Sequence, residues 1–291
     1  MIIFYYIFSA VAWLLSILPF KIIYILSDFL YFITYCVYGY RKKVVFDNLK
    51  NSFPKKTDKE IKIIAKKFYH NLCDIILETI KAKTISKKEL KKRVKFKNIE
   101  ILEALYKSKR NVMAISGHCG NWEWISILPA LTDYTVIVAE KPITNKFFEN
   151  YINIIRTRFN LKLAYFKKIF KILIKNKGEH ILTILGSDQT PTKSEIEYWT
   201  KFMNQETPMF IGAEKIAKYL DYSVVFFDMQ RTKRGFYEVE IIKITDTPQK
   251  TDEFEITEKH IHLLEKSITK HPDNWLWSHK RWKHKKMPKN T

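Results

Sequence analysis

The chain has 291 residues, of which 46% are apolar, and its 51 Lys and Arg against 30 Asp and Glu give a formal net charge of +21. This length and apolar content suit one large domain or two small ones with a substantial core. The three cysteines are far apart, with no C-x-x-C pair, and the histidines are scattered. Both patterns argue against a disulfide framework and a metal site, so we expect no metal and a reducing, cytosol-facing compartment.

The positive charge is unevenly distributed along the chain. Residues 1–40 contain Lys21 and Asp28 as their only charged side chains, so the whole net charge lies on the residues that follow. A cationic body joined to an apolar N-terminus is typical of proteins that bind an anionic membrane surface. Charge alone would also suit nucleic acid. The apolar N-terminus favours the membrane, and we expect no nucleic-acid partner.

The N-terminus contains two apolar runs, MIIFYYIFSAVAWLLSILPF and IIYILSDFLYFITYCVYGY, and the second ends at a cluster of basic residues. The first is close to the minimum of about 17 residues that can span the hydrocarbon layer. It lacks the basic start and small-residue cleavage site of a signal peptide. Two interpretations remain open. Residues 2–18 span or dip into the bilayer, with the second run at the interface, or both runs are helices of a soluble core.

Strands alternate with helices in the rest of the chain. Residues 57–83 are predicted to form a helix, because Thr57 and Glu60 fit a capping box and apolar residues recur at helical spacing. The predicted strands are 111–116, 134–140, 180–188, 222–230 and 235–244, the last an edge strand; the other predicted helices are 121–131, 145–159, 209–220 and 252–270. This alternation predicts an α/β layered fold. The chain has no G-x-G-x-x-G or P-loop pattern, which argues against nucleotide binding.

The stretch SGHCGNWEW, residues 116–124, is the strongest candidate for a functional site. It places His118 after a predicted strand, where open α/β sheets bind ligands, and Gly117 and Gly120 permit a tight turn and close substrate approach. Asn121 is expected to cap the following helix, which puts Glu123 in its first turn. The Glu123 carboxylate can then hold one imidazole nitrogen and leave the other to take a proton from a hydroxyl.

Two alternatives to this interpretation remain. A histidine and a glutamate at this spacing also occur as structural side chains, because H-x4-E without its context is a weak signal. Cys119 is a second candidate nucleophile. Adjacent side chains rarely converge as a Cys–His pair must, so we expect Cys119 not to react.

Several blocks of the sequence, taken in order, match one family. GHCGNWE fits an H-x4-D/E motif, and it is followed by EKPITNKFFENYINIIRTRFN, NKGEHILTILGSDQTP, KFMNQETPMFIGAEKIAK and WLWSHKRWK. With the apolar N-terminus and YRKKVVFDNLKNSFP, these blocks resemble the bacterial late acyltransferases of lipid A biosynthesis, the lauroyl/myristoyl transferase branch of the lysophospholipid acyltransferase superfamily. The resemblance covers nearly all 291 residues.

The resemblance implies a mixed central sheet flanked by helices, with residues 1–40 as a membrane anchor or interfacial helices and residues 41–291 as the catalytic domain. It implies transfer of a fatty acyl chain from a thioester to a hydroxyl of a lipid A precursor or a related glycolipid. The donor would be acyl carrier protein or acyl-CoA, and no cofactor is expected beyond this co-substrate. The catalytic domain would face the cytoplasm from the inner membrane and bind an anionic lipid acceptor there.

The resemblance also implies roles for single residues. His118 would be the general base and Glu123 its orienting carboxylate, with direct attack and no acyl-enzyme. Arg156 and Arg158 diverge by about 200° on one helix. Only one is therefore expected to face the site, where it would hold a phosphate or the developing oxyanion. The candidate substrate-binding residues are Gly120, Asn121, Lys141, Arg156, Arg158, Asp188, Gln189 and Thr207.

Some of these candidates also have structural interpretations. Lys141 is either a phosphate ligand or a solvated lysine. Asp188 is expected to orient the acceptor or Arg156, with a turn cap as the alternative, and Thr207 is as well suited to capping the 209–220 helix. Four residues of the C-terminal block are expected to pack or lie at the membrane interface: Trp275, Trp277, His279 and Arg281.

The chain departs from the family pattern in two places. Gln189 stands where some relatives have a second acid, and FMNQETP has fewer Phe and Gly residues than many relatives. Because of these departures, the resemblance does not identify the acceptor lipid. An aminolipid or a lysophospholipid is the first alternative to a lipid A precursor, and a non-enzymatic basic membrane-binding protein is the second alternative function.

Overall fold

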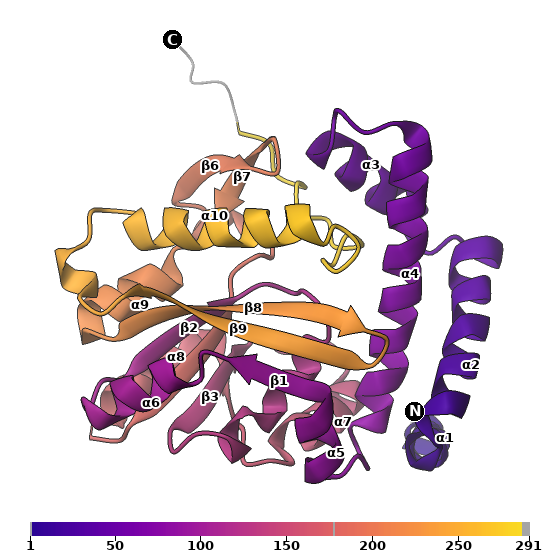
Figure 1. The fold of residues 1–291 in the computed structure, drawn as a ribbon, viewed down its shortest axis with the longest axis horizontal. Coiled ribbons are helices and arrows are strands. Elements are labelled where there is room, and N and C mark those ends of the chain that lie inside the picture. Colours follow the sequence, from indigo (N-terminus) through magenta and orange to yellow (C-terminus); the bar gives the residue numbers. More distant parts are fainter. Residues whose placement is uncertain (1, 177, 287–291) are drawn as a thin grey trace.

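The computed structural model of the protein describes residues 2–176 and 178–286. A mixed sheet lies between layers of helices, and the N-terminal helices stand at one end of it (Figure 1). The α-helices are α1 (Ile2–Ile17), α2 (Phe20–Tyr31), α3 (Lys42–Ser52), α4 (Asp58–Lys81), α5 (Lys87–Arg93), α6 (Glu100–Lys107), α7 (Lys146–Thr157), α8 (Phe166–Lys175), α9 (Gly212–Leu220) and α10 (Glu255–Lys270). A π-helix, η1 (Phe32–Val37), continues α2, and the 3-10 helices are η2 (Trp122–Ala130), η3 (Lys193–Glu195) and η4 (Pro248–Lys250).

The strands are β1 (Val94–Lys97), β2 (Val112–Ser116), β3 (Thr135–Glu140), β4 (Lys162–Tyr165), β5 (Ile181–Gly186), β6 (Tyr198–Phe202), β7 (Gln205–Met209), β8 (Ser223–Lys233) and β9 (Phe236–Thr245). Seven of these described strands form one sheet in the order β1-β9-β8-β2-β5-β3-β4, and β6 and β7 form a separate hairpin. In the sheet, β9 and β1 run opposite to the other five strands. This confirms the predicted α/β fold with a mixed central sheet.

The order of the strands determines where a site can form. β2, β5 and β3 are parallel neighbours, so the residues that follow them meet at one edge of the sheet. Ligands of open α/β sheets bind at that edge. Successive side chains of β2 point to opposite faces of the sheet, so they pack in the core on both sides of it. Val112 and Ala114 pack with α6, η2 and α7, whereas Met113 and Ile115 pack with α8, α9 and α10.

Some elements differ from the sequence predictions. Residues 235–244 are not an edge strand, because β1 pairs with β9 on its outer side. β1 has only four residues, too few for alternation to be recognised. Residues 121–131 contain the 3-10 helix η2, which includes Pro129. The 209–220 helix begins later than predicted, because Met209 ends β7 and α9 starts at Gly212.

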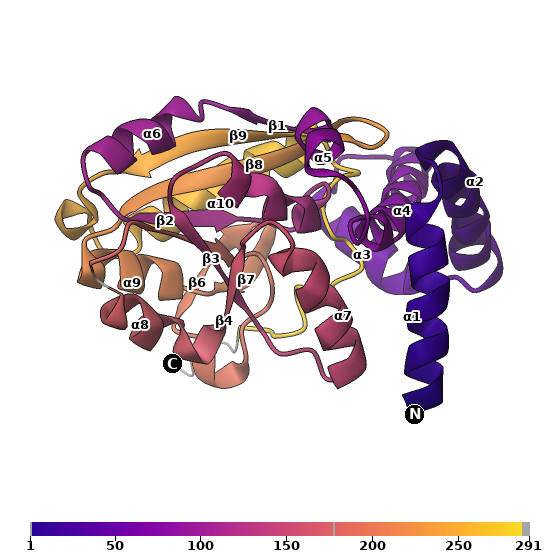
Figure 2. The same cartoon turned by 90° about the horizontal axis from the view of Figure 1, so that it is seen from below.

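α4 connects the N-terminal helices to the sheet. It begins with the predicted capping box, in which Thr57 and Glu60 each accept the other's backbone N–H. α2 packs along α4, and α1 extends beside α7 (Figure 2). Near the end of α4, Lys81 Nζ donates to the carbonyl oxygens of Ser16 and Leu18 at 2.7 and 2.8 Å. The turn between α1 and α2 is therefore attached to the rest of the protein.

Candidate active site

The His118 loop follows β2 directly, and glycines give it its shape. A Cβ on Gly117 would lie 2.6 Å from a methyl carbon of Leu264, and Gly120 has φ +56°, a conformation that favours glycine. On the neighbouring strand, a Cβ on Gly186 would lie 3.1 Å from Cε1 of His118. The glycines therefore let the loop lie against the core and leave space for the imidazole.

The carboxylate that contacts His118 belongs to Asp188, just after β5. Its Oδ1 lies 2.6 Å from His118 Nδ1, and its Oδ2 accepts the His118 backbone N–H at 2.8 Å. The prediction that Glu123 orients the imidazole is therefore wrong. His118 and Asp188 follow adjacent parallel strands and so meet at the sheet edge, whereas the 3-10 turn of η2 directs Glu123 elsewhere.

Glu123 holds Arg156 of α7 instead. Arg156 Nε and Nη2 donate to the two Glu123 oxygens at 2.7 and 2.6 Å, and its Nη1 donates to Glu140 at the end of β3. The side chain of Arg156 is 19% exposed, that of Glu123 is 10% exposed and that of Glu140 is 9% exposed. Because two carboxylates already surround the guanidinium, these contacts do not support the phosphate or oxyanion role predicted for Arg156.

The pKa values of the His118–Asp188 pair shift in opposite directions. Burial lowers the pKa of His118, but the charge of Asp188 and the hydrogen bond to it outweigh burial and raise that pKa above 6.5. Burial raises the pKa of Asp188, but its charge and hydrogen-bond interactions with His118 hold it well below 3.8. Because Asp188 is an ionised acceptor, His118 Nδ1–H donates a hydrogen bond to its Oδ1, and the neutral imidazole has its lone pair on Nε2, where it can act as a base.

A cavity of about 270 Å³ lies beside this pair. Its polar lining includes His118, Glu123, Glu140, Arg156 and Gln189. The apolar lining includes Ile125, Val138, Ile143, Leu161, Ile184 and Phe210. Apolar walls with a few converging polar groups are typical of binding sites for small molecules.

Three of the predicted substrate-binding residues line this cavity: Lys141, Arg156 and Gln189. The Gln189 amide nitrogen lies 3.2 Å from His118 Nε2, on the side of the ring opposite Asp188. Lys141 lines the cavity and is exposed to solvent. The structure therefore brings Gln189 to the nitrogen that Asp188 leaves free.

The other predicted substrate-binding residues have structural contacts. Arg158 donates to two backbone carbonyl groups between α4 and α5. Asn121 donates to Glu78 of α4 at 2.8 Å and does not cap η2. Thr207 lies in β7, where its hydroxyl donates to a carbonyl group of its own hairpin, so it caps no helix. The backbone N–H of Gly120 donates a hydrogen bond to the Asn274 carbonyl group in the C-terminal segment. These contacts do not support substrate binding by the four residues.

Sequence reasoning missed two residues of the site. Glu140 could have been found, because it is a carboxylate at the end of a predicted strand, which lies two places from the His118 strand in the sheet. Trp275 packs in the core, the first of the two roles expected for it, but its indole N–H also donates to Asp188 Oδ2 at 2.7 Å, and no sequence signal indicated that contact. Cys119 is buried, and burial raises the pKa of its thiol well above 9.0, as expected for a cysteine that is not a nucleophile.

Comparison with known proteins identifies the family. The sequence model of the bacterial lipid A biosynthesis acyltransferases matches residues 1–284. No curated protein matches the chain. The match includes the His118 loop, Asp188 and the C-terminal segment that contacts both. The chain therefore belongs to the bacterial lipid A biosynthesis acyltransferases, and the protein is an acyltransferase.

Proposed function

We propose that this protein moves a fatty acyl chain from a thioester donor to a hydroxyl of a lipid A precursor, with His118 as the general base and Asp188 as the carboxylate that holds it. The observation that carries the proposal is the His118–Asp188 pair, 2.6 Å apart, beside a cavity with apolar walls. The imidazole supplies the acid–base chemistry, and the apolar walls suit an acyl chain.

The reaction proceeds by direct attack on the thioester. His118 Nε2 takes the proton of the acceptor hydroxyl while its oxygen attacks the thioester carbonyl carbon. When the carbon–sulfur bond breaks, the leaving thiolate receives that proton from Nε2. Asp188 keeps Nδ1–H pointing toward its own carboxylate. It also stabilises the imidazolium that exists between the two proton transfers. Gln189 faces Nε2 at 3.2 Å, so its amide must move aside when the acceptor hydroxyl binds.

We propose that the donor is an acidic acyl carrier protein that docks on α8. Phe166 lines the cavity and begins α8, and the exposed residues Lys167, Lys168, Lys171 and Lys175 follow it. The hydrogen bond from the Thr192 backbone is the largest cause that lowers the pKa of Glu195, and the positive charges of Lys141 and Lys167 lower that pKa further. A cationic helix beside the cavity therefore gives an acidic carrier a complementary surface.

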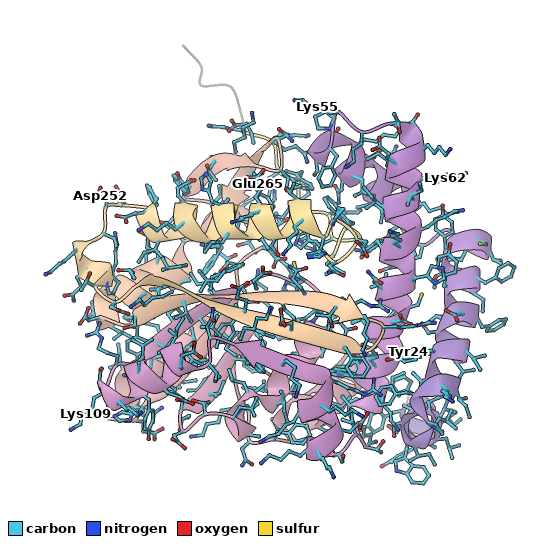
Figure 3. The ribbon with its side chains drawn as sticks, viewed as in Figure 1. Tyr24, Lys55, Lys62, Lys109, Asp252 and Glu265 are labelled. Carbon is cyan, nitrogen blue, oxygen red and sulfur yellow. The ribbon has the colours of Figure 1, made fainter. Side chains whose placement is uncertain are left out.

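Reversing two of these charges should weaken docking of the carrier. For Lys167→Glu/Lys171→Glu we expect the KM for acyl carrier protein to rise about tenfold at low salt, with kcat little changed, because rim charges act mainly on encounter. Lys62→Glu/Lys66→Glu is the matched control, since these exposed lysines have the same spacing on α4, where Lys62 points away from the sheet (Figure 3). Equal KM values for both variants in a steady-state assay would exclude α8 as the docking surface.

The membrane contact is the second part of the proposal. Among the described residues, only residues 20–37 form a helix long and apolar enough to cross a membrane by length and composition. Large apolar side chains lie on one exposed stripe of it, at i, i+3, i+7, i+10 and i+11: Ile22, Ile25, Phe29, Phe32 and Ile33. A one-sided stripe of this kind is typical of helices that lie in the membrane surface.

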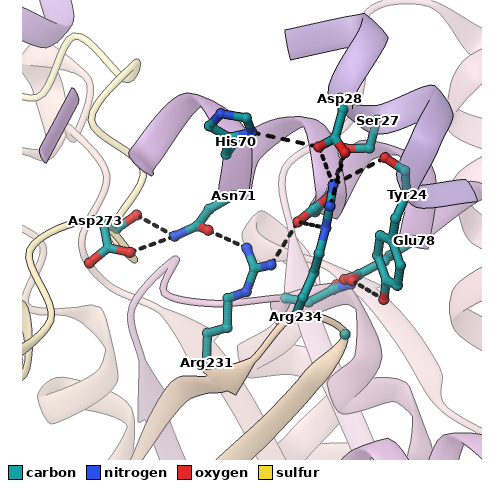
Figure 4. A network of polar contacts seen from close by, with 12 residues as sticks. Tyr24, Ser27, Asp28, His70, Asn71, Glu78, Arg231, Arg234 and Asp273 are labelled. Carbon is teal, nitrogen blue, oxygen red and sulfur yellow. Dashed lines mark hydrogen bonds and ion pairs between the residues drawn. The ribbon is translucent and has the colours of Figure 1, made fainter. Parts of the chain in front are cut away.

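The opposite side of α2 is bonded to the protein, as Figure 4 shows. Ser27 donates to Asp74 of α4 at 2.6 Å, and Arg234 in the β8–β9 turn contacts Asp28 and Asp74 at 2.6 and 2.8 Å. Asp74 is 1% exposed. Pulling α2 away would break the buried Ser27–Asp74 hydrogen bond and the Asp28–Arg234 ion pair, while Asp74 would keep its pairs with Arg231 and Arg234. We therefore propose that α2 lies along the membrane surface and does not cross it.

Polar substitutions in the α2 stripe should weaken membrane binding. Ile25→Ser/Phe29→Ser removes two side chains that are 67% and 62% exposed. We expect about tenfold or more weaker binding to vesicles in a sedimentation assay, because each large apolar side chain contributes about 1–2 kcal/mol when it enters the interface. Phe170→Ser/Ile174→Ser on α8 is the matched control and should bind normally. Unchanged binding of the α2 variant would exclude α2 as the contact surface.

To test the overall function, the purified enzyme is mixed with a donor, acyl carrier protein that carries fatty acyl groups. A lipid A precursor should gain the mass of one acyl chain in mass spectrometry. An aminolipid and a lysophospholipid are tested in parallel. If one of these is acylated and the lipid A precursor is not, the acceptor is that lipid. No transfer to any acceptor by correctly folded protein would contradict the enzymatic proposal and favour a membrane-binding protein.

A further inference from the structure

The C-terminal segment runs across the His118 loop. Trp275 pairs with Cys119 as an isolated antiparallel bridge. On either side of it, the Gly120 N–H donates to the Asn274 carbonyl at 3.0 Å, and the Leu276 N–H donates to the His118 carbonyl at 3.1 Å. The backbone of the loop that presents the imidazole is therefore held by a segment from the other end of the chain.

Trp275 also completes the contacts of the Asp188 carboxylate. Its Nε1–H donates to Oδ2 at 2.7 Å, and the same oxygen accepts the His118 backbone N–H at 2.8 Å. The other oxygen, Oδ1, faces His118 Nδ1 at 2.6 Å. Trp275 and Asp188 are each 2% exposed, so water does not replace the indole N–H. With both oxygens bonded, the carboxylate has one orientation toward the imidazole.

Aromatic side chains fix the indole ring itself. Trp277 packs edge-on against Trp275, with ring centroids 4.7 Å apart, and Phe202 and Trp282 lie at 5.8 and 5.9 Å. Trp277 donates its own N–H to the carbonyl oxygen of Pro272, away from the carboxylate. The two neighbouring tryptophans thus share burial and packing but differ in what their N–H groups bind.

We propose that Trp275 is a positioning residue for acyl transfer: its indole N–H fixes the Asp188 carboxylate and limits how strongly that carboxylate attracts the Nδ1 proton of His118. This role rests on the proposed function of the His118–Asp188 pair. A hydrogen bond donated to a carboxylate withdraws negative charge from it. Without the indole N–H, Asp188 would stabilise the imidazolium more strongly. His118 would then become a neutral base only at higher pH.

Charged and titratable side chains surround the pair on several sides. Glu123 and Arg156 act on the charge of His118, and they form an ion pair with each other. Behind Asp188 lie His260, His279 and Arg281, for which burial lowers the pKa to about 4, about 4 and about 10. The two histidines are therefore neutral and the arginine charged between pH 6 and 9, so neither their charge nor that of the arginine changes while His118 titrates.

Trp275→Phe keeps an aromatic ring but removes the N–H donor together with part of the ring volume, and Trp277→Phe loses the same volume without losing a contact to Asp188. We expect kcat to fall about tenfold, the usual effect of losing one hydrogen bond to a charged group. The acid limb of kcat/KM reports the pKa of His118, which the contact with Asp188 raises against the effect of burial, and in the variant this limb should move to higher pH than in the wild type. Trp277→Phe is the matched control and should leave the acid limb in place.

Nitrogen NMR of labelled histidines measures the His118 pKa without any turnover. A higher His118 pKa in Trp275→Phe, and not in Trp277→Phe, would support the positioning role. The same pKa in Trp275→Phe and the wild type, or an equal shift in both variants, would overturn it. If the shift appears but the wild type transfers no acyl group, the positioning contact stands and the proposed function fails.

Discussion

Replacing Asp188 with asparagine should lower kcat about 10⁴-fold, the largest effect we expect for a change of so few atoms. The new amide can turn its NH₂ group toward Nδ1 of His118, which moves the ring proton to Nε2. The nitrogen that faces Gln189 and the cavity would then have no lone pair with which to accept the hydroxyl proton. The amide also cannot stabilise the imidazolium that forms after proton transfer. Single-turnover acyl transfer measures this loss independently of product release.

Two matched variants show whether the effect belongs to Asp188. Asp228→Asn changes a carboxylate on β8 that accepts hydrogen bonds from Ser267 and Gln230, and it should retain most activity. Glu123→Gln should lose less than Asp188→Asn, because Glu123 holds Arg156 and does not contact the imidazole. If Glu123→Gln were the more damaging change, the assignment of Asp188 as the orienting carboxylate would be wrong.

Removing the imidazole with His118→Ala should lower kcat about 10³–10⁴-fold while the protein stays folded, because the general base is lost but the cavity and Asp188 remain. The alanine leaves space beside Gly186, so added imidazole should restore part of the activity. Cys119→Ala should transfer acyl chains at nearly the wild-type rate. An acyl group found on Cys119 by mass spectrometry would show that the direct-attack mechanism is incorrect.

The periodicity of the sequence was sufficient for the long elements of the fold but not for the short ones. α4 was predictable because Thr57 and Glu60 mark its start and apolar residues repeat along its length. β1 and β4 have four residues each, so neither carries a recognisable alternation. The pairing of β1 with β9 is a tertiary contact, and no local pattern in residues 94–97 indicates it.

The site was predictable in its residue types but not in its pairing. His118 was identified from its glycines and its place after a strand, both of which are local features. Its carboxylate partner depends on which strand lies beside β2, and the sequence did not give the strand order. Glu123 is close in sequence, but the 3-10 turn of η2 directs it to Arg156. Trp275 was missed for a similar reason, because its contact with Asp188 joins two distant parts of the chain.

The bridge between Cys119 and Trp275 has a consequence for biosynthesis. A ribosome releases the N-terminal helices first, so α1 and α2 leave it while most of the strands are still untranslated. His118 and Asp188 are made next, but the indole that fixes the carboxylate is made long after both of them. If α2 binds the membrane and Trp275 positions Asp188 as proposed, a nascent chain attaches before it can catalyse, and acyl transfer begins only when the segment around Trp275 has left the ribosomal tunnel and closed over the His118 loop.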